Sequence, residues 1–301
     1  MYPYEYEKTP FNAQIKRGTE YNLITIDAPY EPDVSQSKRI HIYDFFVENP
    51  HYNLIFLHGI GNGNIPYLMW FGKRFQKHGI RTFFLILPYH GPRAPKDWNG
   101  GEPFFSSSPA HCVVRFLQAV IDVRRTIDYI ETNSNVPIAI MGLSFGGMIA
   151  TMSLAIDKRI RKGILAFTGG DWRWINWYSP YLEDVREMYR TQGNEMGCRS
   201  ESDCIKIRGN ATKVVEGFNR IEDIFKHPVT CYHYDPLSYG KFVDQEVLFF
   251  SGVFDKVIPE RSSQALILTL KNVHKVVVPS GHKSSYFFRR FIAKKVIKFL
   301  I

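Results

Sequence analysis

Apolar residues recur along the chain in two alternating patterns. Short apolar runs of strand length alternate with longer segments in which apolar residues return every three or four positions, the spacing of one helix face. Strands are predicted at residues 21–28, 39–47, 52–58, 81–88, 138–141, 162–168, 246–251 and 273–279. Helices are predicted at residues 65–78, 112–132, 148–155, 259–270 and 287–301. This alternation favours an α/β fold with a mostly parallel central sheet flanked by helices.

Two regions interrupt the alternation. Residues 90–111 form a loop rich in Pro, Gly and Ser, and loops of this length are usually functional or mobile. Residues 171–239 form a mostly helical segment that opens with an aromatic cluster. Because the segment follows a strand on the side where ligands bind such sheets, we predict a cap or lid inserted between core segments 1–170 and 240–301. The alternative is a helical subdomain whose aromatic residues pack among themselves.

The stretch around Ser144 carries the strongest chemical signal. It runs Gly142-Leu-Ser144-Phe-Gly146 between the predicted strand 138–141 and the predicted helix 148–155. A serine on such a sharp turn has a strained backbone, so its neighbours must be small, and Gly142 and Gly146 provide that room. The helix N-terminus aims partly positive N–H groups at the reacting centre. We interpret Ser144 as a nucleophile on an elbow; an ordinary strand-turn-helix is the alternative.

A serine nucleophile needs a base, and the base needs a carboxylate that orients it. Asp255 comes shortly after the predicted strand 246–251, and His282 shortly after the predicted strand 273–279. The carboxyl ends of parallel strands share one edge of a sheet, where ligands bind. We therefore expect Ser144, Asp255 and His282 to meet at that edge.

In this order, Ser144, Asp255 and His282 resemble the triad of the α/β-hydrolase fold, whose members place acid and base after successive late strands. The resemblance covers residues 52–301 apart from the insertion. It implies that Ser144 is the nucleophile and that His282 acts first as general base and then as general acid. It also implies that Asp255 orients the imidazole, and it implies no metal or organic cofactor.

The same resemblance implies an oxyanion hole made of two backbone N–H groups. One belongs to Phe145, the residue after the nucleophile, and the candidate for the other is Ile60. The glycines of the loop 58–63 allow its backbone to turn toward a substrate carbonyl. The loop lacks the run of three glycines typical of lipase-like members, which leaves the subgroup open. His58 is interpreted as a residue that holds this loop rather than as a base.

Other residues near the predicted strand ends are weaker candidates. Asp171 is the alternative to Asp255 as the acid, and Asp235 is interpreted as a cap where the chain leaves the insertion. His90 follows the fourth strand and is expected to line the pocket or to pin its loop. Three tryptophans of the aromatic cluster are further pocket candidates, and the cap interpretation predicts that Trp172, Trp174 or Trp177 borders the serine pocket.

Composition sets limits on partners. The chain has 301 residues, 45% of them hydrophobic, and a formal net charge of +9. Its cations are largely dispersed and no nucleic-acid motif accompanies them, so we expect no nucleic-acid partner. The densest basic cluster, in residues 289–298, alternates with apolar residues. We interpret it as a final helix that packs its apolar face on the sheet rather than as a membrane-surface helix.

The apolar runs and the N-terminus bear on the compartment expected for the protein, and the cysteines bear on metal binding and disulfides. The apolar runs have strand length, too short for a transmembrane segment, and the N-terminus lacks the pattern of a secretory signal, so a cytoplasmic protein is expected. The four cysteines show no zinc pattern. Cys198 and Cys204 are close enough in sequence to bridge, although free thiols are favoured in a reducing cytosol.

These observations favour a serine hydrolase that cleaves a carboxylic ester or thioester through an acyl-enzyme. A peptidase, an amidase or an acyltransferase would use the same triad, and nothing in the sequence separates them. An α/β-hydrolase scaffold that binds a ligand or partner without catalysis is the alternative of another class. The expected partner is a small-molecule ester or acyl substrate, and the oligomeric state stays open.

Overall fold

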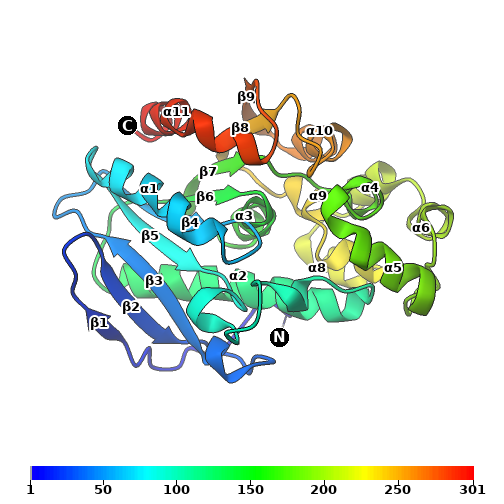
Figure 1. Ribbon diagram of the computed structural model, residues 1–301, viewed down its shortest axis with the longest axis horizontal. Coiled ribbons are helices and arrows are strands. Elements are labelled where there is room, and N and C mark those ends of the chain that lie inside the picture. Colours follow the sequence, from blue (N-terminus) through cyan, green and yellow to red (C-terminus); the bar gives the residue numbers. More distant parts are fainter. Residues whose placement is uncertain (1) are drawn as a thin grey trace.

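Nine strands form one sheet through the middle of the molecule (Figure 1). The computed structural model describes residues 2–301. The strand order is β1-β2-β3-β5-β4-β6-β7-β8-β9; pairings from β5 to β9 are parallel, and those among β1, β2, β3 and β5 are antiparallel. The bounds are β1 Gln14–Lys16, β2 Asn22–Asp27, β3 Arg39–Phe45, β4 Tyr52–Leu57, β5 Ile80–Ile86, β6 Ile138–Leu143, β7 Ile160–Ala166, β8 Glu246–Gly252 and β9 Asn272–Val278. The predicted mostly parallel sheet is confirmed; β1 escaped prediction because its three residues are all exposed.

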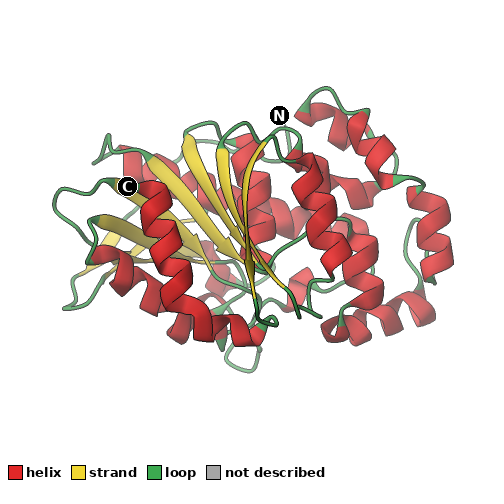
Figure 2. Cartoon of the chain, turned by 90° about the horizontal axis from the view of Figure 1, so that it is seen from above, coloured by secondary structure: helices red, strands yellow, loops and turns green. Residues whose placement is uncertain are grey.

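Helices cover both faces of this sheet (Figure 2). Their bounds are α1 Asn64–Gln76, α2 Pro109–Glu131, α3 Phe145–Ile156, α10 Glu260–Thr269 and α11 Arg289–Leu300. The core cluster that α1 and α11 share includes Leu54 and Phe56 of β4, whereas the cluster that α2, α3 and α10 share includes Ile55 and Leu57. Successive residues of one strand thus supply two opposite cores, which is why β4 is continuously apolar.

The segment between β7 and β8, residues 171–239, is called the insertion below. Its helices are α4 Trp172–Tyr178, α5 Glu183–Gln192, α6 Glu201–Arg208, α7 Ala211–Glu216, α8 Ile221–Lys226 and α9 Pro236–Gly240. Helices α4, α5, α6 and α8 gather at the right of Figure 1. Buried side chains of the insertion, such as Tyr189 and Tyr232, belong to the same hydrophobic cluster as Phe116 of α2 and Met148 of α3. The insertion is therefore joined to the core by continuous apolar contact.

The predicted loop 90–111 contains two 3₁₀ turns, Gly91–Arg93 and Glu102–Phe104. Arg93 is fully buried, and its guanidinium donates hydrogen bonds to Asp122 of α2 at 2.5 Å and to the Ile86 carbonyl at 2.8 Å. Loss of either partner of such a buried ion pair would strongly destabilise the fold, because the other charge would stay buried without compensation. The loop is therefore held against α2 and the end of β5.

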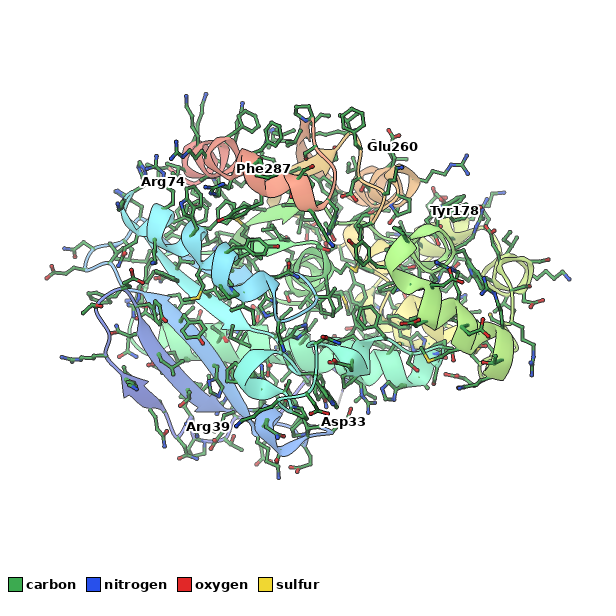
Figure 3. The ribbon with its side chains drawn as sticks, in the orientation of Figure 1. Asp33, Arg39, Arg74, Tyr178, Glu260 and Phe287 are labelled. Atoms are coloured by element: carbon green, nitrogen blue, oxygen red, sulfur yellow. The ribbon has the colours of Figure 1, made fainter. Side chains whose placement is uncertain are left out.

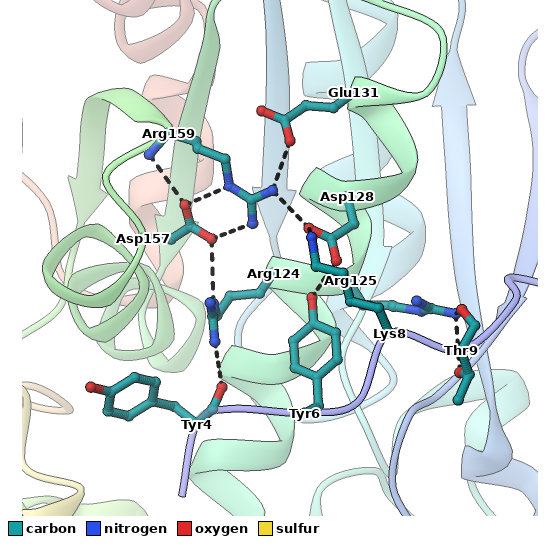
Figure 4. Close-up of polar contacts among 10 residues, drawn as sticks. All are labelled: Tyr4, Tyr6, Lys8, Thr9, Arg124, Arg125, Asp128, Glu131, Asp157 and Arg159. Carbon is teal, nitrogen blue, oxygen red and sulfur yellow. Dashed lines mark hydrogen bonds and ion pairs between the residues drawn. The ribbon is translucent and has the colours of Figure 1, made fainter. Parts of the chain in front are cut away.

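The N-terminal segment lies along α2 and is held there by polar contacts (Figure 4). The guanidinium of Arg124 donates to the Tyr4 carbonyl at 2.6 Å, and the Tyr6 hydroxyl donates to Asp128 at 2.8 Å. Asp128 also accepts from Arg159 at 2.7 Å, which connects α2 to the start of β7. These contacts involve α2, and none of the candidate site residues lies on this helix.

Two further expectations concern thiols and membrane spans. All four cysteines are buried free thiols, including Cys198 and Cys204, for which a bridge was left open. Burial raises the pKa of the Cys198 thiol to about 11 and that of Cys231 to about 12, so both are protonated at neutral pH. Within residues 2–301, no helix combines the length and the apolar character that crossing a bilayer requires.

Candidate active site

Ser144 lies between β6 and α3 in a backbone conformation that non-glycine residues rarely adopt, with φ 53° and ψ −119°. Its N–H donates to the Ala166 carbonyl at the end of β7 at 2.8 Å. A Cβ atom added to Gly142 would approach the Gly146 oxygen to 2.2 Å, and one added to Gly146 would approach the His58 oxygen to 2.5 Å. The two glycines of the predicted elbow are therefore required by close backbone packing.

The side chains predicted to cooperate meet at the carboxyl edge of the sheet. The Nε2 atom of His282 lies 2.8 Å from the Ser144 Oγ, and its Nδ1 lies 2.8 Å from Asp255 Oδ2. The other oxygen of Asp255 accepts hydrogen bonds from the N–H groups of Val257 at 2.9 Å and Ile258 at 3.0 Å. With Nδ1 donating to the carboxylate, Nε2 is left as the acceptor for the serine hydroxyl proton.

The loop after β4 runs beside the serine. A Cβ atom added to Gly59 would lie 3.4 Å from the Ser144 Cβ, and Ile60 and Phe145 line the same pocket as Ser144. Phe145 opens α3, where the first N–H groups have no partner within the helix. Asn64 holds the loop by donating a hydrogen bond to the Ile60 carbonyl. The two candidate oxyanion donors thus belong to segments that border the nucleophile.

His58 has the contacts of a structural residue. Its ring is fully buried, its Nδ1 donates to the Gly59 carbonyl at 2.7 Å, and its Nε2 accepts the Leu87 N–H at 3.1 Å. Burial lowers the pKa of His58 to about 4, so the imidazole is neutral at physiological pH. Both ring nitrogens are occupied in holding the loop to β5, which agrees with its interpretation from the sequence.

A pocket of about 510 Å³ opens onto Ser144 and His282. Its wall is mainly apolar and comes from α1, α3, α4, α11 and the segments that follow β7 and precede α5 and α10: Leu68, Phe71, Met148, Phe167, Trp172, Ile175, Leu182, Ile258 and Ile292. Polar groups from Asn64, Tyr67, Tyr181, Lys283 and Tyr286 complete it. Among the described residues that line the pocket, His282 and Lys283 are the basic side chains and none is Asp or Glu.

The pocket wall includes one of the four side chains predicted for it. Trp172 lines the pocket, whereas His90, Trp174 and Trp177 do not. The His90 ring turns back to the Pro88 carbonyl at 2.8 Å, so this residue pins its loop. Trp174 lies under the guanidinium of Arg261 on the outside of α4, and Trp177 packs against Tyr189 within the insertion. Trp172 thus meets the expectation that one of the three tryptophans borders the pocket, whereas Trp174 and Trp177 are corrected as pocket candidates; of the two roles expected for His90, the structure shows the one in the loop.

Asp171, the alternative acid, is engaged elsewhere. It forms an ion pair with Arg208 at 3.0 Å, and Arg208 also meets Asp235 at 2.7 Å. Asp235 accepts the N–H groups of Asp171 at 2.8 Å, Trp172 at 3.0 Å and Leu237 at 3.0 Å. Asp235 thus caps the chain where it leaves the insertion, as predicted. We call Asp171, Arg208 and Asp235 the insertion network.

Within residues 2–301, no group of three or more His, Cys, Asp or Glu side chains is arranged to hold a metal ion. The residues that sequence reasoning missed are those of the pocket wall, notably Asn64, Leu182 and Tyr286. They come from separate elements and share no motif, so a pattern along the chain gives no signal for them.

The site combines a serine on a strained elbow with a His–Asp pair at later strand ends of a mostly parallel sheet. Comparison of the sequence with models of protein families identifies the class of protein that has this combination. A family model described as "Alpha/beta hydrolase family" matches residues 54–288, and the chain belongs to this family. A search of curated protein sequences finds no significant match.

Solved structures show the same fold at low identity. An acetyl xylan esterase from Paenibacillus sp. R4 superposes with a TM-score of 0.69 at 16% identity, over 97% of this chain and 90% of that one. Acetyl xylan esterase 1 from Thermoanaerobacterium sp. gives 0.65 at 13% identity, over 96% and 88%. Pyrococcus horikoshii acylaminoacyl peptidase gives 0.64 at 12% identity, over 93% of this chain and 41% of that one.

Proposed function

We propose that this protein is a serine hydrolase that cleaves carboxylic esters through an acyl-enzyme formed on Ser144. The observation that carries the proposal is the hydrogen-bonded series from Ser144 Oγ through His282 to Asp255, with both heavy-atom distances at 2.8 Å. Membership of the α/β hydrolase family supports a hydrolytic reaction. The esterases among the similar structures support the choice of an ester as the proposed substrate.

In this mechanism, His282 Nε2 takes the proton of Ser144 as its Oγ attacks the ester carbonyl. The backbone N–H groups of Phe145 and Ile60 stabilise the oxyanion of the tetrahedral intermediate. Collapse of that intermediate breaks the bond to the alcohol, which receives the proton from His282. Water, deprotonated by the same imidazole, then attacks the acyl carbonyl; collapse of the second intermediate releases the acid, and His282 returns the proton to Ser144 Oγ. Asp255 orients the ring and stabilises the imidazolium.

The substrate group that enters the pocket is proposed to be apolar and larger than acetyl. The pocket of about 510 Å³ lies in the range of cavities that hold drug-sized ligands. Its wall offers hydrocarbon and aromatic contacts, and burial of each methylene adds roughly 0.8 kcal/mol. We therefore expect p-nitrophenyl esters of medium-chain acids to be cleaved with a lower KM than the acetate.

A fluorophosphonate probe tests the catalytic assignment. Wild-type protein is expected to be labelled, and Ser144→Ala to lose all labelling while keeping its circular dichroism spectrum. Ser202→Ala, which changes an exposed serine of α6, is the matched control and is expected to label like wild type. Asp255→Asn is expected to slow ester hydrolysis by about 10⁴-fold, because an amide NH₂ facing Nδ1 favours the wrong tautomer of the imidazole.

Two results would count against the proposal. Folded wild-type protein that takes no label would favour a non-catalytic scaffold. Faster cleavage of an acyl anilide than of the matching ester would favour an amidase or peptidase, the class to which the similar acylaminoacyl peptidase belongs by name.

A further inference from the structure

The net charge of this chain is confined to its C-terminal part. Residues 261–301 contain nine of the 38 Lys and Arg residues and no Asp or Glu. The remaining 29 cations, 38 minus 9, are matched by 29 acidic residues, so residues 1–260 carry no formal net charge. The whole formal charge of +9 therefore belongs to α10 after its first residue, β9, the His282 loop and α11.

Four of these nine cations lie on one exposed stripe. Exposed residues recur every three or four positions along the 3₁₀ segment Lys283–Phe288 and α11, as expected for one helix face. We call these residues the basic-aromatic stripe: Phe287, Arg290, Phe291, Lys294, Lys295 and Lys298. The opposite face of α11, with Ile292 and Val296, is buried on the sheet, as the sequence predicted.

The stripe combines free cations with exposed aromatic rings. Among residues 2–301, no carboxylate lies within ion-pair distance of its four cations. Phe287 is 81% exposed and Phe291 41%; Figure 3 labels Phe287 at the top of the molecule, beside α11. Phe254, 67% exposed, donates its N–H to the Ser280 carbonyl in the neighbouring His282 loop.

The stripe is continuous with the rim of the serine pocket. Lys283, Ser285 and Tyr286 line the pocket and directly precede Phe287. The Tyr286 ring packs edge-on against Tyr67 of α1 at a centroid distance of 4.7 Å, so this part of the rim is fixed relative to the sheet. A surface that bound the stripe would therefore lie next to the entrance of an apolar pocket.

We propose that the basic-aromatic stripe docks this protein on a membrane surface that contains anionic lipids. Cations attract anionic headgroups, and exposed phenylalanines gain by entering the interfacial region. A second copy of the chain is a poor occupant, because two such stripes would bring like charges together. Docking would be peripheral, through the outer face of a helix whose inner face stays packed on the protein.

Co-sedimentation with sucrose-loaded vesicles tests the proposal. Wild-type protein is expected to bind vesicles of equimolar phosphatidylcholine and phosphatidylglycerol and not vesicles of phosphatidylcholine alone. Each Lys or Arg near an anionic surface contributes roughly fivefold to binding, so Arg290→Gln/Lys294→Gln/Lys295→Gln is expected to bind about 100-fold more weakly. The matched control, Lys16→Gln/Arg17→Gln/Lys96→Gln, removes three exposed cations from other faces and is expected to bind like wild type.

A second variant separates a membrane from a nucleic acid or another polyanion. Phe287→Ser keeps the charge and is expected to weaken vesicle binding by about tenfold, because an aromatic ring no longer enters the interface. The proposal is overturned if wild-type protein fails to bind anionic vesicles. It is overturned as well if the control with three cations removed from other faces loses as much binding as the variant of the stripe. It is also overturned if Phe287→Ser has no effect while RNA displaces the vesicles. Binding requires no catalysis, so Ser144→Ala is expected to bind normally whatever its activity.

Discussion

The insertion network is expected to be a sensitive charged element of the fold, because its ion pairs are buried. Arg208 is 2% exposed, and its guanidinium serves two carboxylates, those of Asp171 and Asp235. The Tyr232 hydroxyl donates to the Arg208 carbonyl at 2.8 Å, and the guanidinium lies over that tyrosine ring. Arg208→Met keeps a side chain of similar length and removes the positive charge, which leaves two carboxylates buried side by side.

The stability that Arg208→Met is expected to lose follows from the burial of these charges. Removing one partner of a buried ion pair destabilises a protein by about 3–5 kcal/mol, because the remaining charge is left without compensation. In a chain of this size, each kcal/mol lowers the melting temperature by roughly 2–4 °C, so a decrease of about 10 °C is expected. Arg190→Met is the matched control: it removes exposed pairs with Glu183 and Glu187 in the same insertion and should have little effect.

The loss of folding stability in Arg208→Met should depend on pH. Burial raises the pKa of Asp171 above its ordinary value of 3.8, and the charge on Arg208 opposes this rise. A raised pKa favours the protonated form in the folded state, so folding loses stability as pH rises through the folded pKa. Without Arg208 the pKa rises further, and the destabilisation should grow from pH 4 toward neutrality. Urea unfolding at both pH values measures it; equal stability of Arg208→Met and wild type at pH 7 would refute the reasoning.

Two further predictions concern the elbow. Ser144→Gly is expected to be about 1 kcal/mol more stable than Ser144→Ala, because relief of a strain of roughly 1–3 kcal/mol exceeds the entropy that glycine adds to the unfolded chain; equal melting temperatures would contradict this. Gly146→Ala is expected to lose about 3 kcal/mol and all esterase activity, because its Cβ meets backbone oxygens of β4 and the following loop. Gly63→Ala, where an added Cβ meets nothing within 4 Å, is its control in the same urea titrations.

The sheet and the hydrogen-bonded trio could be predicted because both depend on local patterns. A strand that is apolar on both faces indicates a parallel sheet. Polar residues that follow such strands lie at the carboxyl edge of that sheet. Ser144, Asp255 and His282 follow β6, β8 and β9, so the order of strands was enough to bring them together. No property of distant segments entered that prediction.

The pocket wall could not be predicted with equal success, because it depends on how the insertion is turned. Trp172 lines the pocket together with Ile175, three residues later on the same face of α4. Trp174 and Trp177 are also three residues apart, but they share a different face. The helical period therefore divides the aromatic cluster into two sets, and only the structure shows which set faces Ser144.

The insertion network contacts the start of α4, the helix that carries Trp172 and Ile175. Asp171 is the first residue of the insertion, Asp235 caps its last helix α9, and Arg208 joins the two. Asp235 also accepts the N–H of Trp172 at 3.0 Å, which fixes the first turn of α4 and the direction of its pocket-facing side. The proposed catalytic residues thus follow strands of the core, whereas the first turn of the pocket-lining helix α4 is held by a charge network within the insertion. A change in that network should alter the preference for ester chain length while leaving the distance between Ser144 and His282 unaffected.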